Sequence, residues 1–177
     1  MGPVGHAIVA YLAWTTFTHL RGGRSPTTPE VWLVALGSQF PDLVDKPLAW
    51  SLSVLPAGRS LGHSLFTVVA LAILLRRLVP PDRHSLIVPF LAAILTHDLT
   101  DAIAPLNRGE PEYVAYLMWP VVEQPQYDPP PPLLAAFGES VLHGLSGTGV
   151  VVIAVTVAVW LADGAPGLPR GRRSRKD

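Results

Sequence analysis

The chain has 177 residues, of which 49% are hydrophobic and 15% are charged, and its formal net charge is zero. Mean hydropathy is +0.37. Soluble domains usually carry about 25% charged residues, so this composition favours a membrane protein, and the length predicts a single domain. The absence of cysteine excludes disulfides, thiolate metal sites and a cysteine nucleophile.

Apolar stretches recur along the chain, and we expect them to form a polytopic, all-α membrane bundle of about five spans. They cover residues 4–20, 31–44, 61–79, 86–104 and 150–162, the last with a possible extension back to Leu133. A span needs roughly 17–25 residues, so the second stretch is short and would have to tilt or thin the bilayer. The N-terminus lacks the basic region and cleavage site of a signal peptide, so we expect the first stretch to be retained.

The segment 105–132 differs from these stretches, since its ends are rich in proline and it carries Tyr113, Tyr116, Trp119 and Tyr127. Aromatic residues of this kind often lie at the level of the lipid headgroups. The segment also leaves the fourth stretch from the end that carries His97. We therefore expect an interfacial loop, a cap near the site, or both.

Basic residues indicate how the chain is oriented in the membrane. If residues 133–161 cross once, ten of the 13 basic residues lie on the side opposite His6, and only Lys46, Arg59 and Arg108 lie with it. The positive-inside rule then places the tail 165–177 in the cytoplasm, and residues 1–164 form the membrane domain. A second crossing, with a turn near 144–149, would remove this asymmetry, so we favour one crossing.

Metal-ligand residue types gather at alternate ends of successive apolar stretches. They are His6, Asp42 with Asp45, His63, and His97 with Asp101. If the helices alternate in direction, all of them meet at one end of the bundle, on the extracytoplasmic side. His97 and Asp101 also share one helix face, because they are four residues apart. Ionisable groups within membrane segments are costly and usually functional.

Each of these residues also has a structural explanation. His97 and Asp101 could form an ion pair or a cap, and His6 and His63 could be buried structural side chains. Asp42 and Asp45 end a helix, where carboxylates oppose the dipole and therefore need a nearby cation, either Lys46 or a metal.

Three further histidines lie elsewhere in the sequence. His19 and His84 fall at the opposite ends of their stretches and are expected to be solvated. Glu139 and His143 form another i,i+4 pair, which either joins the site or is an internal ion pair.

Three imidazoles and three carboxylates suit a divalent metal, zinc first and manganese or iron as alternatives, with one or two ions. His6, Asp42, His63, His97 and Asp101 are the expected ligands. Asp45 is expected to be a bridging ligand or general base, and Arg59 to orient an anionic group such as phosphate.

Four short motifs together resemble a known family. They are LGSQFPDLVD (36–45), RSLGHS (59–64), LTHDLTD (95–101) and YLMWP (116–120), following the N-terminal His6. In this order they resemble the YdjM-like, membrane-bound, metal-dependent hydrolases, also called LexA-binding, inner-membrane-associated hydrolases. The order of ligands is more distantly similar to the zinc-dependent phospholipase C and P1 nuclease superfamily. That pattern ends in His-x-x-x-Glu, whereas this chain has Glu139 and His143 in reverse.

We therefore expect a membrane-bound, metal-dependent hydrolase that acts on a phosphoester or lipid-like substrate. The sequence contains no nucleic-acid module and no glycine-rich phosphate loop. Two alternatives remain open. One is a transporter that uses the same groups as an ion path, and the other is a structural or partner-binding membrane protein whose metal fixes helix ends.

Overall fold

The computed structural model describes residues 2–125, 138 and 147–169. This part of the chain is helical and contains no strand, which confirms the all-α prediction. The elements are α1 (Pro3–Gly22), α2 (Thr28–Lys46), η1 (Pro47–Ser51), α3 (Leu65–Leu78), η2 (Pro81–Leu86), α4 (Ile87–Asn107), η3 (Pro111–Met118) and α6 (Gly147–Ala162).

Local sequence signals set several helix ends. α1 stops at Gly23, whose φ of 58° is the left-handed conformation that glycine tolerates best. α2 begins with a capping box between Thr27 and Glu30. The guanidinium of Arg24 lies 2.7 Å from Glu30 and, together with hydrogen bonds from Thr27, lowers the pKa of Glu30 to about 2. The turn between α1 and α2 is thus held by charge as well as by backbone conformation.

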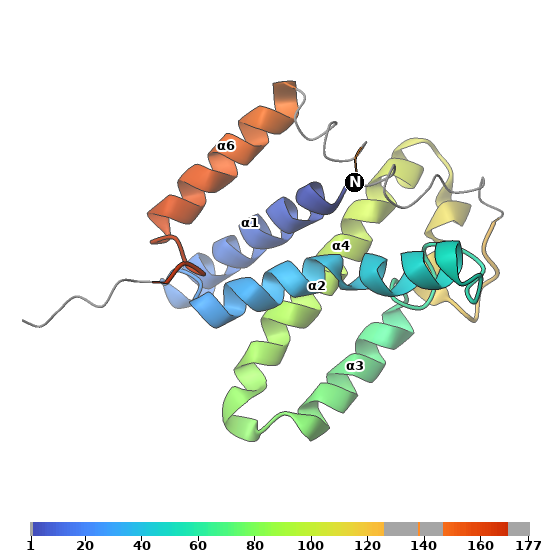
Figure 1. Ribbon diagram of the computed structural model, residues 1–177, viewed down its shortest axis with the longest axis horizontal. Coiled ribbons are helices and arrows are strands. Elements are labelled where there is room, and N and C mark those ends of the chain that lie inside the picture. Colours follow the sequence, from blue (N-terminus) through green and yellow to red (C-terminus); the bar gives the residue numbers. More distant parts are fainter. Residues whose placement is uncertain (1, 126–137, 139–146, 170–177) are drawn as a thin grey trace, which may run out of the picture.

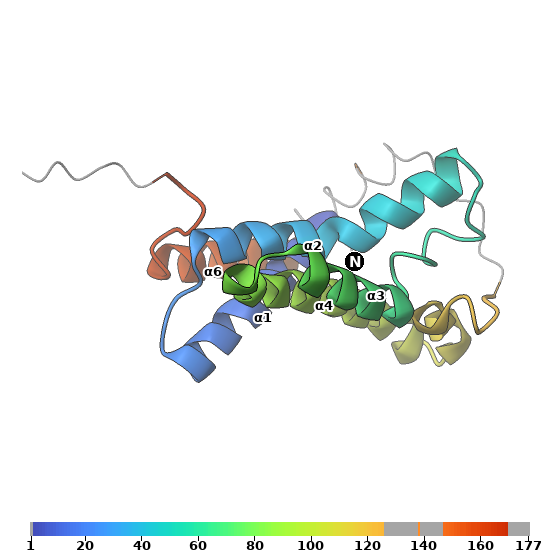
Figure 2. The same cartoon turned by 90° about the horizontal axis from the view of Figure 1, so that it is seen from below.

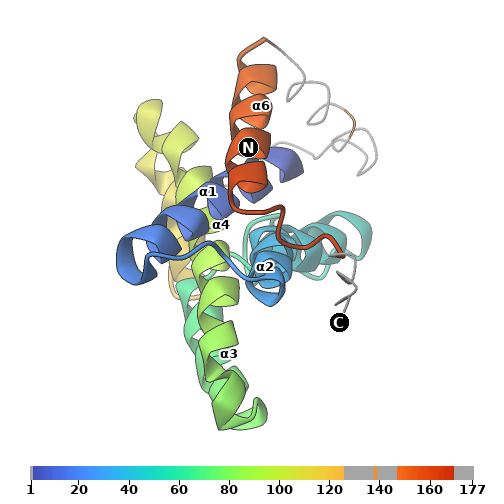
Figure 3. The ribbon, with the colours of Figure 1, turned by 90° about the vertical axis from the view of Figure 1, so that its left-hand side faces the viewer.

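The site is positioned by the crossing of α2 and α4. Figures 1 and 3 show α2 running across α4 rather than beside it, while α3 and α4 form a hairpin through η2. At the crossing, a Cβ on Gly37 would lie 2.4 Å from the carbonyl oxygen of Phe90 and 2.9 Å from Ala93. Only a residue without a side chain lets the two backbones come this close.

A small apolar core surrounds this crossing. Ala10 and Trp14 of α1, Val34 of α2 and Ala93 of α4 are buried against one another. Figure 2 shows α2 and η1 along one side of α1, α3 and α4. Because α1 and α2 run in opposite directions, the start of α1 lies beside the second half of α2 and the second half of α4 (Figure 1).

The prediction of five spans is not confirmed. Within the described ranges, one helical segment, Pro81–Asn107, is long and apolar enough to cross a membrane, and the apolar α6 is shorter. The third stretch is helical only from Leu65, because residues 52–64 form a loop and Ser64 caps α3. The extension of the last stretch toward Leu133 falls outside the described residues.

α6 is anchored to α1 by one buried carboxylate, Asp163. Its Oδ2 accepts hydrogen bonds of 2.6 Å from both Tyr11 and Thr15, and its Oδ1 lies 2.7 Å from Nε2 of His19. His19 is half exposed, as its expected solvation requires, and it also contacts Asp163. Burial would raise the pKa of Asp163, but the hydrogen bonds from Thr15, Tyr11 and His19 outweigh it and lower the pKa.

Candidate metal site

Asp45 fixes the position and the tautomer of His63. Asp45 is fully buried at the end of α2, and its oxygens accept the backbone N–H groups of Ser60 (2.6 Å) and Gly62 (2.7 Å). Its Oδ2 also lies 2.7 Å from Nδ1 of His63, which must carry the proton. The loop fits closely here, since a Cβ on Gly62 would lie 2.8 Å from the carbonyl oxygen of Pro41. The lone pair of His63 is therefore on Nε2.

His97 and His6 are oriented in the same way. Nδ1 of His97 lies 2.6 Å from the carbonyl oxygen of Ser38, which can only accept. Nδ1 of His6 lies 2.9 Å from the hydroxyl of Thr100, whose own hydrogen goes to the carbonyl of His97. The rings of His6 and His97 stack at 3.7 Å. All three imidazoles thus place Nδ1 on an acceptor and leave Nε2 for another partner, as metal-binding histidines usually do.

Four donor atoms converge from three parts of the fold. Nε2 of His63 and Nε2 of His97 lie 3.2 Å apart, and each is 3.7–3.8 Å from Oδ1 of Asp42 and 3.8 Å from Oδ2 of Asp101. In a tetrahedral zinc site with bonds of about 2.0–2.2 Å, donor atoms lie roughly 3.3–3.6 Å apart. Two imidazole lone pairs this close repel each other unless a cation lies between them. The donor set therefore fits a metal ion.

His6 adjoins this donor set. Its Nε2 lies 3.2 Å from Oδ1 of Asp101, and His6, Asp42 and His97 form a second ligand group whose donor atoms all lie within 4.8 Å of one another. All five expected metal ligands are buried and lie in one cluster. The cluster contains donors beyond those one tetrahedral ion needs, so either one or two ions are compatible with it.

The two remaining predicted site residues lie at the edge of the cluster. Asp45 lies behind His63, where its oxygens are already used by N–H donors, rather than among the converging donor atoms. Arg59 donates from Nε to Oδ2 of Asp101 at 2.7 Å. On the other side, Nζ of Lys46 lies 2.5 Å from Oδ2 of Asp42.

Lys46 and Arg59 form the solvent-facing edge of the site. Their side chains are 26% and 35% exposed, whereas the ligand side chains are exposed by 10% or less. Nζ of Lys46 lies 5.5 Å from the ring centre of Trp50. That ring packs against Gly58, where a Cβ would lie 2.6 Å from the indole nitrogen. This contact joins η1, which follows Lys46, to the loop that carries Arg59.

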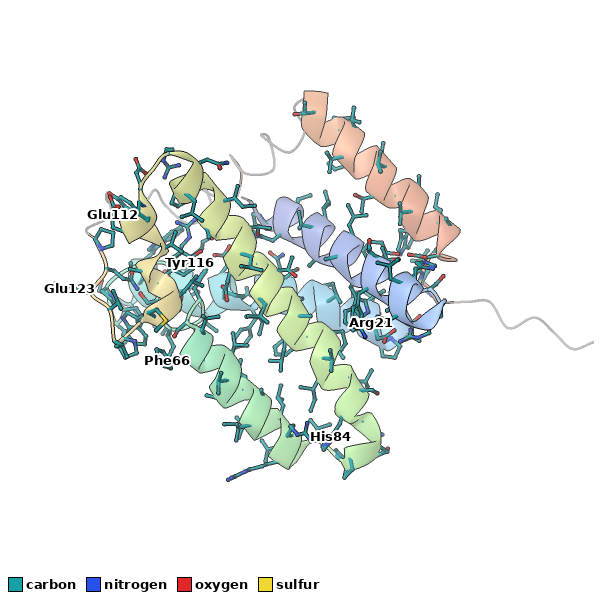
Figure 4. All side chains as sticks on the ribbon, turned by 180° about the vertical axis from the view of Figure 1, so that it is seen from behind. Arg21, Phe66, His84, Glu112, Tyr116 and Glu123 are labelled. Carbon is teal, nitrogen blue, oxygen red and sulfur yellow. The ribbon has the colours of Figure 1, made fainter. Side chains whose placement is uncertain are left out.

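The aromatic segment after α4 covers the site, as the cap interpretation predicted. Tyr116 of η3 is fully buried, its ring lies edge-on to His63 at 5.7 Å, and its hydroxyl donates to the carbonyl of Asp98 at 2.7 Å. Ser64 donates to the carbonyl of Trp119 at 2.6 Å. Figure 4 shows Tyr116 turned inward, with Arg21 and His84 far away at other ends of the molecule.

The residues of this site lie within a match to a known family. Residues 1–164 match the family described as YdjM inner membrane protein. The chain belongs to the YdjM inner membrane protein family. This family match places the protein in the membrane and covers every candidate ligand. No curated protein and no solved structure matches the chain.

One buried acid in this YdjM family member was missed at the sequence level. Asp98 is 1% exposed, and neither of its carboxylate oxygens has a hydrogen-bond partner among the residues described. The i,i+4 spacing to Asp101 marks its neighbour His97 as a candidate ligand, whereas Asp98 has no such spacing to another ligand type. Glu139 and His143 lie outside the described residues.

Charge balance supports a cation at this site. The described side chains in and around the cluster include four carboxylates, Asp42, Asp45, Asp98 and Asp101, against the two cations of Lys46 and Arg59. Burial without a hydrogen-bond partner favours the neutral form of Asp98. With neutral imidazoles and the other three carboxylates ionised, one negative charge remains. Buried charge without a partner is expensive, and one divalent ion would offset it.

Proposed function

We propose that this YdjM family protein is a membrane-bound, zinc-dependent hydrolase of phosphoester substrates. The observation that carries the proposal is the pair of nitrogens of His63 and His97, 3.2 Å apart, each 3.7–3.8 Å from a carboxylate oxygen of Asp42 and of Asp101, close to the donor spacing of a tetrahedral zinc site. His6, which lies beside Asp101, completes the ligand set or serves a second ion.

The chain supplies the remaining parts of the reaction. When bound, a divalent ion supplies Lewis-acid chemistry, which activates water near neutral pH and stabilises the charge that develops on oxygen. Asp45 holds His63 in the tautomer that points Nε2 at the site, so we assign Asp45 a positioning role in place of the general-base role expected from sequence. Tyr116 and the rest of the cap exclude bulk water.

The charged side chains beside the ligands indicate the class of substrate. Arg59 and Lys46 are the exposed charges beside the buried ligands, and each already contacts a ligand carboxylate. Cationic groups here suit a phosphoryl anion, which guanidinium groups bind with two parallel hydrogen bonds. A lipid-like substrate suits a site in a membrane protein.

A structural metal site is the competing function, and one observation favours it. Four protein donors are typical of closed structural zinc sites, whereas catalytic sites keep one position open. The transporter alternative has less support. The described buried carboxylates are those of the cluster, Asp163 after α6 and Glu30 at the start of α2, and Glu30 and Asp163 already have partners of their own.

Metal analysis followed by a substrate panel tests the proposal. Protein purified in detergent without chelator should carry one or two zinc ions per chain, and zinc-loaded protein should cleave bis(p-nitrophenyl) phosphate or a phospholipid. His63→Ala should abolish both. Stoichiometric zinc with no turnover on any phosphoester would favour the structural alternative, and protein that takes up no zinc or manganese would contradict both.

The orientation of the protein is part of the same proposal. The site faces away from the cytoplasm and the C-terminus lies within it, in a chain that crosses the membrane several times, because most basic residues lie away from the site. A reporter fused after Asp177 should read cytoplasmic and one inserted near Arg108 external. The opposite pair of results would move the site to the cytoplasmic face.

A further inference from the structure

An open cavity of about 570 Å³ adjoins the candidate metal site, a size within the usual range for small ligands. Two segments line it, 56–57 before Arg59 and 119–125 in the cap. Gln124 reaches from the cavity to the hydroxyl of Ser60 at 3.4 Å, and the carbonyl of Trp119 accepts from Ser64. Ser60 also binds Asp45. The cavity therefore shares a wall with the loop that holds His63.

Hydrogen-bond donors are scarce on the walls of this cavity. Pro56, Pro120 and Pro125 have no backbone N–H. The N–H groups of Val121 and Val122 already bond to the carbonyl oxygen at residue 118, within the cap itself. Neither these prolines nor these two valines can donate to a ligand in the cavity.

The lining residues include a hydrogen-bond acceptor and an aromatic ring. Glu123 contributes a carboxylate to the lining, and Gln124 turns its amide nitrogen to Ser60. The amide oxygen of Gln124 is buried and has no hydrogen-bond partner in the part of the chain that the structure describes. Trp119 adds an aromatic face. The carboxylate of Glu123 and the indole of Trp119 together form an environment that complements a cation.

We infer that this cavity binds a protonated amine of the substrate whose phosphoryl group lies at the metal site. The inference rests on the proposed function and specifies its substrate as a zwitterionic phosphodiester with an amine-bearing headgroup. Lys46 and Arg59 face the anionic part of such a substrate, and Glu123 faces the cationic part. The opposite charges of Glu123 and of these two cations match the two charges of the headgroup.

Binding to the zinc-loaded, full-length protein in detergent tests this inference. The probes are glycerophosphoethanolamine and glycerophosphoglycerol, which have similar sizes and the same phosphodiester but differ in the amine. Isothermal titration should show the amine-bearing probe binding about threefold to thirtyfold tighter, as expected for one exposed charge pair plus an aromatic contact.

Variants of the cavity identify the source of the preference. Glu123→Gln and Trp119→Leu should each reduce the preference for the amine and leave the binding of glycerophosphoglycerol unchanged. Trp119→Leu keeps the backbone carbonyl that Ser64 uses. Glu112→Gln is the matched control, because Glu112 is an exposed acid of the same cap outside the cavity lining (Figure 4). Zinc content of each variant reports whether the site is intact.

The outcomes separate the two proposals. Equal binding of both probes to zinc-loaded protein, or equal effects of Glu123→Gln and Glu112→Gln, would overturn the amine site and leave the metal site standing. Protein that takes up no zinc and binds neither probe would overturn the proposed function as well. Mixed micelles of phosphatidylethanolamine or phosphatidylglycerol then distinguish a lipid source of the headgroup from a soluble one. The same preference for the amine in micelles would indicate a lipid.

Discussion

Replacing Asp45 by Asn tests the roles within the metal site most directly. Oδ2 of Asp45 accepts from Ser60 and from Nδ1 of His63, while Oδ1 accepts from Gly62. An Asn side chain can keep its oxygen at the Oδ2 position, but its NH₂ group then faces the N–H of Gly62. The variant loses one charge and one hydrogen bond, and it gains a contact between two donors.

The expected magnitude follows from these contacts. A hydrogen bond to a charged group contributes about 1.5–3 kcal/mol, and loss of a partner that orients a metal-binding histidine typically weakens metal affinity by about 10–100-fold. These two figures agree, since each factor of ten corresponds to about 1.4 kcal/mol. We therefore expect the zinc Kd of Asp45→Asn to rise by about 10–100-fold, with full occupancy restored at high zinc.

A competition titration against a chromophoric zinc chelator in detergent measures this change. Turnover at saturating zinc then distinguishes positioning from proton transfer, because a positioning residue affects mainly the affinity. An unchanged zinc Kd with turnover lowered by about 10²–10⁴-fold would identify Asp45 as a general base and refute the positioning role.

Three further predictions concern the ligands, the helix crossing and the anchor of α6. His97→Ala should remove most bound zinc, while His84→Ala, at the far end of the molecule (Figure 4), should leave zinc content unchanged. Gly37→Ala should destabilise the fold by about 1–3 kcal/mol or more through overpacking, seen as a lower Tm, whereas Gly147→Ala, with open space around it, should not. The lowered pKa of Asp163 contributes stability at neutral pH. This stability is lost as the pH falls below about 4 toward the native pKa. The Tm of Asp163→Asn should therefore fall less between pH 7 and pH 3 than the Tm of the wild type.

The positions of the ligands could be predicted because they depend on chain direction. His6 near the start of one helix and Asp42 near the end of the next must meet when the two helices are antiparallel, and the same holds for His63 and His97. The structure adds that His97 lies in the middle of α4, which continues through Pro105 to Asn107. The cluster therefore lies beside the middle of α4, and α1, α2 and the loop before α3 reach it with residues near their ends.

The roles of individual side chains could not be predicted from spacing. Asp42 and Asp45 are three residues apart near the end of α2, yet Asp42 faces the converging nitrogens and Asp45 faces the loop behind His63. The loop decides this, because Gly62 lets it pack against Pro41 and bring its N–H groups to Asp45. The contact between His19 and Asp163 likewise depends on where α6 packs, over 144 residues of sequence.

Burying a polar or charged side chain without a partner costs free energy, and in this site most of these side chains have a hydrogen-bond or ion-pair partner. Each imidazole Nδ1 has an acceptor, and Asp42 and Asp101 each have a cation. What these pairs leave is excess negative charge and the converging nitrogens of His63 and His97, both of which a divalent ion offsets. An ion that binds this arrangement and not the unfolded chain would stabilise the fold by an amount that grows with the logarithm of its concentration over its Kd. The proposed metal binding would therefore be linked to folding, independently of any substrate.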